Sequence, residues 1–182
     1  MAKPLITFDM DGVLCRPPRG FNPGKGIGKS RQSRGAWSPL WLTERWRYAG
    51  RKPMAGALPG WESLAGDYDC RVVSARSEVT RPKTERWFKE HFGFVPEIHL
   101  RPSWKETSAG FKVRKLRELG AVAHFEDDPH TAGWLADLIP VVFVVDWPRN
   151  EWLDGPNIQR IQRIGQARLD LERALADSDG QR

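Results

Sequence analysis

The 182-residue sequence has little of what marks several specialised classes of protein. Its two cysteines, Cys15 and Cys70, are too few and too isolated for a disulfide framework or a zinc site. No uninterrupted apolar run approaches the ~20 residues that span a bilayer. No secretion-signal pattern precedes the first apolar run, and no internal repeat is visible. We therefore expect a cytoplasmic, globular protein with no membrane segment.

Acidic residues are nearly missing from one part of the chain. Residues 16–52 contain ten Lys and Arg but a single acid, Glu44, which gives this segment a net charge of +9. The whole chain carries +6, so the remainder is net negative. A basic segment on a mildly acidic body indicates that the segment meets an anion.

This segment is also rich in Gly, Pro and Ser and lacks periodicity, so we expect residues 16–56 to form a small basic insert. Gly24–Ser30 resembles a phosphate-binding loop, but Pro23 stands where that motif needs glycine, and no strand precedes it. The aromatic rings near residues 37–48 either pack the insert onto the body or stack on a base. Candidate substrate contacts here are Arg31, Arg34, Trp41, Arg45 and Arg47.

The most informative stretch lies at the N-terminus. Leu5 to Phe8 predict a buried strand, which runs directly into Asp9-Met10-Asp11-Gly12. Side chains alternate along a strand, so Asp9 and Asp11 can point to the same side, and Gly12 permits a sharp turn. Two carboxylates this close repel each other unless a cation lies between them or one keeps its proton. The pattern favours a metal-assisted reaction site over a turn with two solvated acids.

Beyond the insert, predicted strands and helices alternate. We expect strands at 70–76, 97–100, 121–126 and 141–145, helices near 59–65, 80–92, 108–120 and 131–138, and a last amphipathic helix through Ile158, Ile161 and Ile164. Alternation predicts an α/β fold, a three-layer Rossmann-like parallel sheet of about five strands with the basic insert after the first. The core would span residues 1–150, and a C-terminal helix with a frayed tail would span 151–182.

Polar residues follow three of these strands where each ends. They are Asp9 with Asp11, Ser74 with Arg76, and Asp127 with Asp128. The carboxyl ends of parallel strands line the ligand crevice of such sheets, so we expect these side chains to converge. Carboxylates without an accompanying thiolate or imidazole suit Mg²⁺.

One cation is also expected at this edge of the sheet. Lys112 shares a helical stripe with Leu116 and Leu119, and a lysine on a core-facing stripe needs an anionic partner. A phosphoryl group or the acid cluster would serve. Lys105, in the preceding loop, is the alternative.

Taken together, these motifs resemble the haloacid dehalogenase (HAD) superfamily of phosphotransferases over residues 5 to about 147. Five stretches are most similar to the 3′-phosphatase domain of polynucleotide kinase-phosphatase, and small nucleotidases of the superfamily are similar as well. These stretches are Ser74–Arg76, Thr84–Phe88, Leu100–Pro102, Phe111-Lys112 and Glu126–Pro129.

The resemblance implies a role for each residue of the site. Asp9 would be the nucleophile and Asp11 the general acid/base, while Ser74 and Lys112 would bind the transferring oxygens. Mg²⁺ would be held by Asp9, the backbone carbonyl of Asp11 and Asp127. Asp128 would bind it directly or through water, and Arg76 would contact substrate.

The expected activity is therefore that of a Mg²⁺-dependent phosphomonoesterase, a hydrolase acting through an aspartyl-phosphate. Its expected substrates are nucleic-acid 3′-phosphate ends or nucleotides, with a nucleotidase or other small-phosphoester phosphatase as the alternative. A third possibility, from another class, is a nucleic-acid-binding module whose catalysis is vestigial.

Overall fold

The structure is a computed structural model that describes residues 2–17, 48, 50–103 and 105–179. The strands are β1 (Leu5–Phe8), β2 (Asp69–Ser77), β3 (Ile98–Arg101), β4 (Ala123–Glu126), β5 (Val141–Val145) and β6 (Ile158–Ile161). The α-helices are α2 (Ala57–Ala65), α3 (Arg81–Phe92), α4 (Ser108–Leu119), α5 (Pro129–Ala136) and α6 (Ala167–Asp179). Three short 3₁₀ turns complete the order, η2 (Glu78–Thr80), η3 (Pro148–Asn150) and η4 (Ile164–Gln166).

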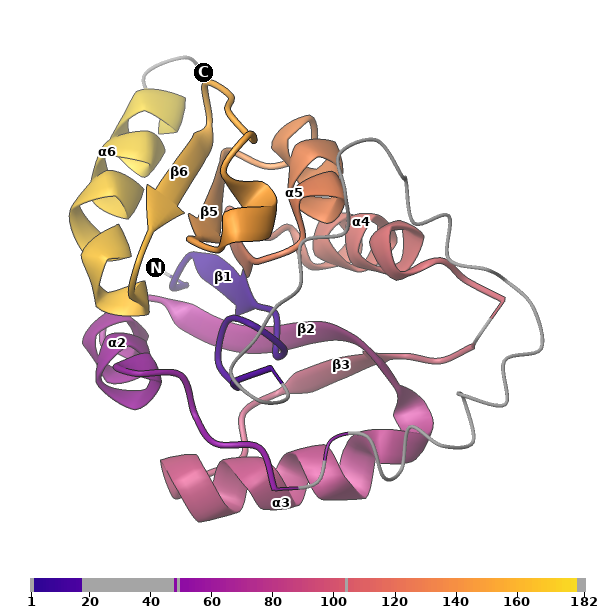
Figure 1. Ribbon diagram of the computed structural model, residues 1–182. Coiled ribbons are helices and arrows are strands. Elements are labelled where there is room, and N and C mark those ends of the chain that lie inside the picture. The colour runs from indigo at the N-terminus through magenta and orange to yellow at the C-terminus, as the bar shows by residue number, and fades with distance from the viewer. Residues whose placement is uncertain (1, 18–47, 49, 104, 180–182) are drawn as a thin grey trace.

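All six strands form one parallel sheet in the order β3-β2-β1-β4-β5-β6 (Figure 1). The chain builds outward from β1 in one direction and then from β4 in the other. The direction in which strands are added therefore reverses between β1 and β4. The connections that leave these two strands run to opposite sides, which leaves room for a ligand at the carboxyl ends of the strands. This confirms the predicted α/β parallel sheet.

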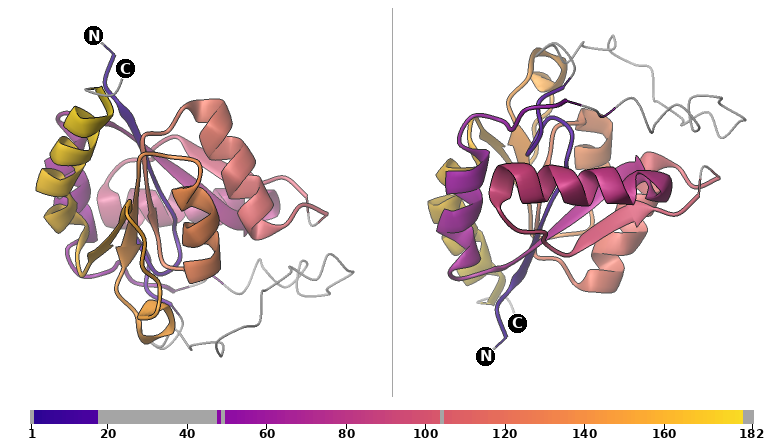
Figure 2. Two further views of the ribbon diagram at one scale, coloured as in Figure 1. Left: turned by 90° about the horizontal axis from the view of Figure 1, so that it is seen from above. Right: turned by 90° about the horizontal axis from the view of Figure 1, so that it is seen from below.

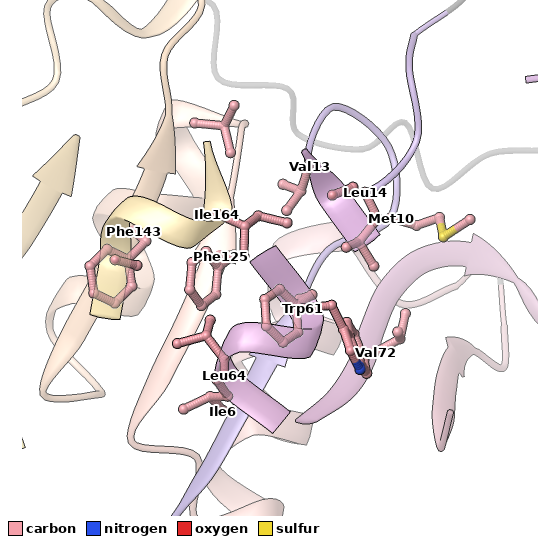
Figure 3. Close-up of a cluster of buried hydrophobic side chains, with 14 of the residues drawn as sticks. Ile6, Met10, Val13, Leu14, Trp61, Leu64, Val72, Phe125, Phe143 and Ile164 are labelled. Carbon is pink, nitrogen blue, oxygen red and sulfur yellow. The ribbon is translucent and has the colours of Figure 1, made fainter. Parts of the chain in front are cut away.

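Helices cover both faces of the sheet, which makes three layers (Figure 2). On one face, α2, α3 and α6 bury Trp61, Phe88 and Leu171 in one apolar cluster with Phe8 and Phe125 of the central strands. Figure 3 shows Trp61, Leu64 and Phe125 of this cluster. The helices α4 and α5 cover the other face through a second apolar cluster. Strand β5 is apolar throughout because alternate residues enter each cluster.

Local signals set the ends of the helices that border the site. The Thr107 hydroxyl accepts a hydrogen bond from Gly110 N at 2.9 Å and starts α4, and Gly120 ends that helix at a φ of +64°. Asp128 Oδ1 accepts from Thr131 N at 3.0 Å and starts α5 directly after β4. The short β4–α5 connection places the polar residues of this corner at the carboxyl edge of the sheet.

The sequence prediction was wrong at the C-terminal side of the sheet. Residues 158–161 form the edge strand β6, paired in register with β5, and so the sheet has six strands instead of about five. Ile158, Ile161 and Ile164 have the spacing of a helix, but they fall on a short strand and the turn η4, and the last helix starts only at Ala167. Among the described residues, no helix is long and apolar enough to cross a membrane.

Candidate active site

The site forms where β1 and β4 lie side by side. Phe8 pairs with Phe125 in the parallel register, and Asp9 N donates to the Phe125 carbonyl at 2.9 Å. The residues that follow each strand, Asp9 on one side and Glu126-Asp127 on the other, therefore emerge at the same level of the sheet. This position is the point at which the strand order reverses.

Asp9 shares a buried lysine with Glu126. The Lys112 ammonium lies 3.0 Å from Asp9 Oδ2 and 2.6 Å from Glu126 Oε2, and all three side chains are buried. The stripe on α4 that the sequence indicated thus points into the acid cluster. Lys105 is exposed on the loop before α4, so between the two alternatives the structure brings Lys112 to the site.

Burial and charge act in opposite directions on these groups. Burial raises the pKa of Asp9 to about 6, although the Lys112 ammonium opposes the shift. Burial would also raise the pKa of Glu126, but Lys112 and His124 hold it below its ordinary range. The same two carboxylates outweigh burial at Lys112 and raise its pKa. The lysine therefore stays charged, with Glu126 as its permanent counter-ion.

Glu126 is fully engaged by the protein. Its Oε1 accepts hydrogen bonds from Asp127 N at 3.0 Å and Asp128 N at 3.1 Å, and its Oε2 accepts from Lys112. Buried His124 lies behind it, 3.4 Å from Oε2, and its Nδ1 is 2.8 Å from Thr7 Oγ1. Burial lowers the pKa of His124, which therefore acts as a neutral packing and hydrogen-bonding group.

Asp127 lies directly against the turn that follows Asp9. A Cβ atom added at Gly12 would be only 1.9 Å from Asp127 Oδ2, and Gly12 has a φ of +89°. Arg149, in the turn after β5, contacts Asp127 Oδ2 at 2.5 Å. The neighbouring Asn150 donates to the Asp127 carbonyl at 3.2 Å. The glycine is required here because it admits the carboxylate.

These residues fit a divalent cation. Oxygens of Asp9, Glu126 and Asp127 lie within 4.8 Å of one another. Asp9 Oδ1 is buried and has no hydrogen-bond partner among the described residues. Burial raises the pKa of Asp127 well above its ordinary range, against the opposing charge of Arg149. A cation between Asp9 and Asp127 would pair the lone oxygen and let both carboxylates ionise. Because the oxygens of Glu126 are already taken, Asp9 and Asp127 are the residues of this cluster that could hold a cation.

Asp11 points toward a pair of arginines. Arg76 Nε and Nη2 each donate to its carboxylate at 2.7 Å, in a two-pronged ion pair, and Arg51 Nη1 donates to Oδ1. Both guanidinium groups are buried. The Tyr48 ring lies against both, 4.2 Å from Arg76 and 4.8 Å from Arg51. Arg76, for which the sequence predicts a substrate contact, holds Asp11 in place in this structure.

The remaining sequence candidates fall in different places. Ser74 is buried within β2, three residues before the strand ends, and its hydroxyl accepts from Arg76 N at 3.5 Å. Asp128 caps α5 through Oδ1, and its Oδ2 lies 3.8 Å from Arg149. The expected contacts in the insert lie outside the described residues. They are Arg31, Arg34, Trp41, Arg45 and Arg47.

Sequence reasoning missed three functional contacts here. Glu126 was seen as part of an acidic motif but not as the partner of Lys112, and neither Arg51 nor Arg149 was singled out. An acid at the last position of a buried strand, 14 residues after a core-facing lysine, is the signal that could have identified Glu126. No pattern in the sequence distinguishes Arg51 or Arg149 from the other arginines.

Gly12→Ala should impair the site more than the fold. The substitution costs about 1–2 kcal/mol for the left-handed backbone and also pushes the Asp127 carboxylate away. Gly93→Ala is a matched control, because Gly93 has a φ of +81° with nothing within 4 Å of the added Cβ. We expect both variants to lose thermal stability, Gly12→Ala more because the buried Asp127 must also move, but a loss of turnover and of Mg²⁺ binding only in Gly12→Ala. Equal turnover in the two variants would contradict the placement of Asp127.

No family model matches the sequence, and no curated protein matches it. Solved structures match along almost the whole chain. A haloacid dehalogenase-like family hydrolase from Xanthomonas campestris is 13% identical with a TM-score of 0.60, covering 100% of this chain and 99% of that one. The protein has the fold of the HAD-like hydrolases.

Two further HAD-fold neighbours show the same extent of similarity. D,D-heptose 1.7-bisphosphate phosphatase from B. bronchiseptica, solved with magnesium and phosphate, is 12% identical with a TM-score of 0.56 and covers 96% of this chain and 99% of that one. A HAD-like hydrolase from Streptococcus pneumoniae is 15% identical with a TM-score of 0.59, covering 92% and 98%. The fold is thus shared with these hydrolases over almost the whole of this chain.

Proposed function

We propose that this protein is a Mg²⁺-dependent phosphomonoesterase that acts through an aspartyl-phosphate on Asp9. The observation that carries the proposal is the state of the Asp9 carboxylate. One oxygen is held by Lys112 at 3.0 Å, and the other is buried without a partner among the described residues, at the switch point of the sheet. A carboxylate in this setting is oriented, only partly neutralised, and suited to nucleophilic attack.

In the first half-reaction, an Asp9 oxygen attacks phosphorus and forms a P–O bond while the ester P–O bond breaks. The leaving oxygen takes a proton from Asp11. Lys112 is placed to bind a phosphoryl oxygen as charge builds up, and the Ser74 hydroxyl can donate to another. A bound Mg²⁺, held by Asp9, Asp127 and the Asp11 carbonyl, would supply positive charge that lets an anionic nucleophile meet an anionic phosphate.

In the second half-reaction, water attacks the phosphorus of the aspartyl-phosphate, gives its proton to Asp11, and the bond to Asp9 breaks. Arg51 and Arg76 fix the position of the Asp11 carboxylate for this role as base. The same ion pairs oppose its protonation, so they must loosen when Asp11 acts as the acid. Substrates with good leaving groups, which need little protonation, should therefore depend least on Asp11.

The substrate assignment rests on the basic segment. Residues 16–52 carry a net charge of +9 with several aromatic rings, which suits a nucleotide or a nucleic-acid 3′-phosphate end. The segment begins directly after the turn that holds Asp11 and Gly12, and returns through Arg51, which contacts Asp11. A ligand bound by this segment would therefore be linked to Asp11, the proposed acid/base group, through Arg51.

Phosphate release across a small panel tests the proposal. The panel contains an aryl phosphate, 3′- and 5′-nucleotides, a 3′-phosphorylated oligonucleotide and sugar phosphates, each with Mg²⁺ and with excess chelator. We expect release that requires Mg²⁺, strongest for the oligonucleotide or a nucleotide. Release that persists in chelator would contradict the metal site. Preference for sugar phosphates would contradict the nucleic-acid assignment, and no release from any member, with oligonucleotide binding retained, would favour a binding module.

A further inference from the structure

A cavity of about 240 Å³ opens beside the candidate active site but does not contain its acids. Its lining residues are Arg16, Met54, Ala55, Trp147, Gln162 and Arg163. Trp147 follows β5, and Gln162 and Arg163 follow β6, so the cavity lies at the carboxyl edge of the sheet, beyond the corner formed by β1 and β4. In parallel sheets this edge is the one that binds ligands.

The cavity adjoins the turn that follows the proposed nucleophile. Trp147 Nε1 donates to the Gly12 carbonyl at 3.1 Å, and this bond fixes the indole against that turn. Arg16 is placed from the same loop by a backbone hydrogen bond from its N to the Lys52 carbonyl at 2.8 Å. Trp147 and Arg16, two walls of the cavity, are therefore held by the same loop backbone that positions the candidate active site.

The arginines of the cavity have no acid beside them in the part of the chain that the structure describes. Arg16 and Arg163 both line the cavity with exposed side chains, and neither has an ion-pair partner among the described residues. None of the described residues that line the cavity carries a carboxylate. Other arginines at this edge of the sheet behave differently. Arg76, Arg149 and Arg160 each contact an acid. Two guanidinium groups at one cavity without an acid are suited to bind an anion in fork geometry.

Beneath the charged rim the walls are apolar. A narrow recess shares Met54, Ala55, Gln162 and Arg163 with the cavity and continues between Val13, Val145 and Ile164. Figure 3 shows Val13 and Ile164 at the upper end of the core that contains Phe125. The cavity thus combines cationic groups, one amide and an aromatic ring above an apolar floor, as small-molecule sites commonly do.

We propose that this arginine cavity binds a small organic anion. Its phosphate or carboxylate would lie between Arg16 and Arg163, and its carbon body would lie on Trp147 and Met54. Two sources share this chemistry: a second anionic group of the substrate that occupies the active site, or a separate ligand that regulates it. The contact between Trp147 and the Gly12 carbonyl gives either one a direct route to the nucleophile turn.

Binding is tested without reference to turnover. Inorganic phosphate is titrated calorimetrically into the metal-free protein with Lys112 intact, so that any phosphate binding in the active site is common to the wild type and the variants. Arg16→Ser/Arg163→Ser should weaken phosphate binding at the arginine cavity by about tenfold or more. The matched control Arg117→Ser/Arg173→Ser removes the same charge from exposed positions on α4 and α6 and should leave the affinity unchanged.

An unchanged phosphate affinity in Arg16→Ser/Arg163→Ser would overturn the arginine cavity as a binding site. An equal loss of affinity in both double variants would also overturn it, because general charge would then explain the binding. A second readout uses the intact chain. Phosphate should protect Arg16 and Arg163 from modification by phenylglyoxal, detected by peptide mass spectrometry, while Arg117 and Arg173 stay reactive. Absence of protection would also contradict the site.

Kinetics then distinguish the two sources, and this step alone rests on the proposed function. A hexose monophosphate is compared with its bisphosphate, and a nucleoside monophosphate with its bisphosphate. If the anion belongs to the substrate, Arg16→Ser/Arg163→Ser should raise the ratio of KM for bisphosphate over monophosphate. If it is a separate ligand, the ratio stays fixed while added phosphate analogue changes both rates alike. Failure of all turnover would refute the proposed function but would leave the calorimetric result standing.

Discussion

Asp9→Asn is expected to abolish phosphatase turnover, by on the order of 10⁴-fold or more, while the protein remains folded. The amide keeps the size of the side chain but cannot form the aspartyl-phosphate. Lys112 keeps Glu126 as a partner at 2.6 Å, so no cation is left unpaired in the core. Phosphate release and thermal unfolding, measured on the same preparation, check both parts of this prediction.

Asp146→Asn is the matched control. Asp146 also follows a strand of the sheet, at the end of β5, but it is exposed and pairs with Arg160. Its substitution should leave turnover within about twofold, because exposed ion pairs contribute little to stability or geometry. Full activity in Asp9→Asn would refute the covalent mechanism. Loss of activity in both variants would point instead to a general effect of charge at this edge of the sheet.

Trapping gives a direct test of the intermediate. Acid quench of the wild-type protein during turnover of a ³²P-labelled substrate should leave label on the chain, and hydroxylamine should release it, because acyl phosphates react with that nucleophile. Peptide mapping should place the label at Asp9. Label on any other residue would identify that residue as the nucleophile and would contradict the role given to Lys112.

The corner of the site could be predicted from the sequence because it depends on strand ends. A buried strand that terminates in Asp9, and another that terminates before Asp127, must present both acids at the carboxyl edge of a parallel sheet. Lys112 followed from helical periodicity, since a core-facing stripe on α4 has to meet the sheet. These inferences use only local periodicity and one rule of topology.

The last strand could not be predicted in this way. Ile158 and Ile161 are three residues apart, which fits one turn of a helix and also a four-residue strand with both faces covered. Only pairing with β5 distinguishes the two, and pairing is a long-range property. The same limit applies to Arg51 and Arg149. Their ion pairs with Asp11 and Asp127 join segments that lie far apart in the sequence.

Lys112→Met is expected to harm both stability and turnover. The variant leaves Asp9 and Glu126 buried without their shared cation, and breaking such a pair costs about 3–5 kcal/mol. Turnover should fall by about 10²–10³-fold, because a charge that stabilises the transferring phosphoryl group is lost. Lys115→Met is the control on the same helix, since Lys115 forms a surface ion pair with Glu118 and none with another of the described residues.

The pH dependence of unfolding separates this ion pair from simple packing. In the wild-type protein the charge of Lys112 opposes burial and holds the pKa of Glu126 below its ordinary value of 4.5. The pair therefore stabilises the fold above that pH, and its contribution disappears as Glu126 becomes protonated at lower pH. The stability difference between wild type and Lys112→Met should accordingly keep its full size from pH 7 to about pH 5 and shrink as the pH falls below 4.5. A difference that does not shrink below pH 4.5 would mean that Lys112 contributes through its methylene stem alone.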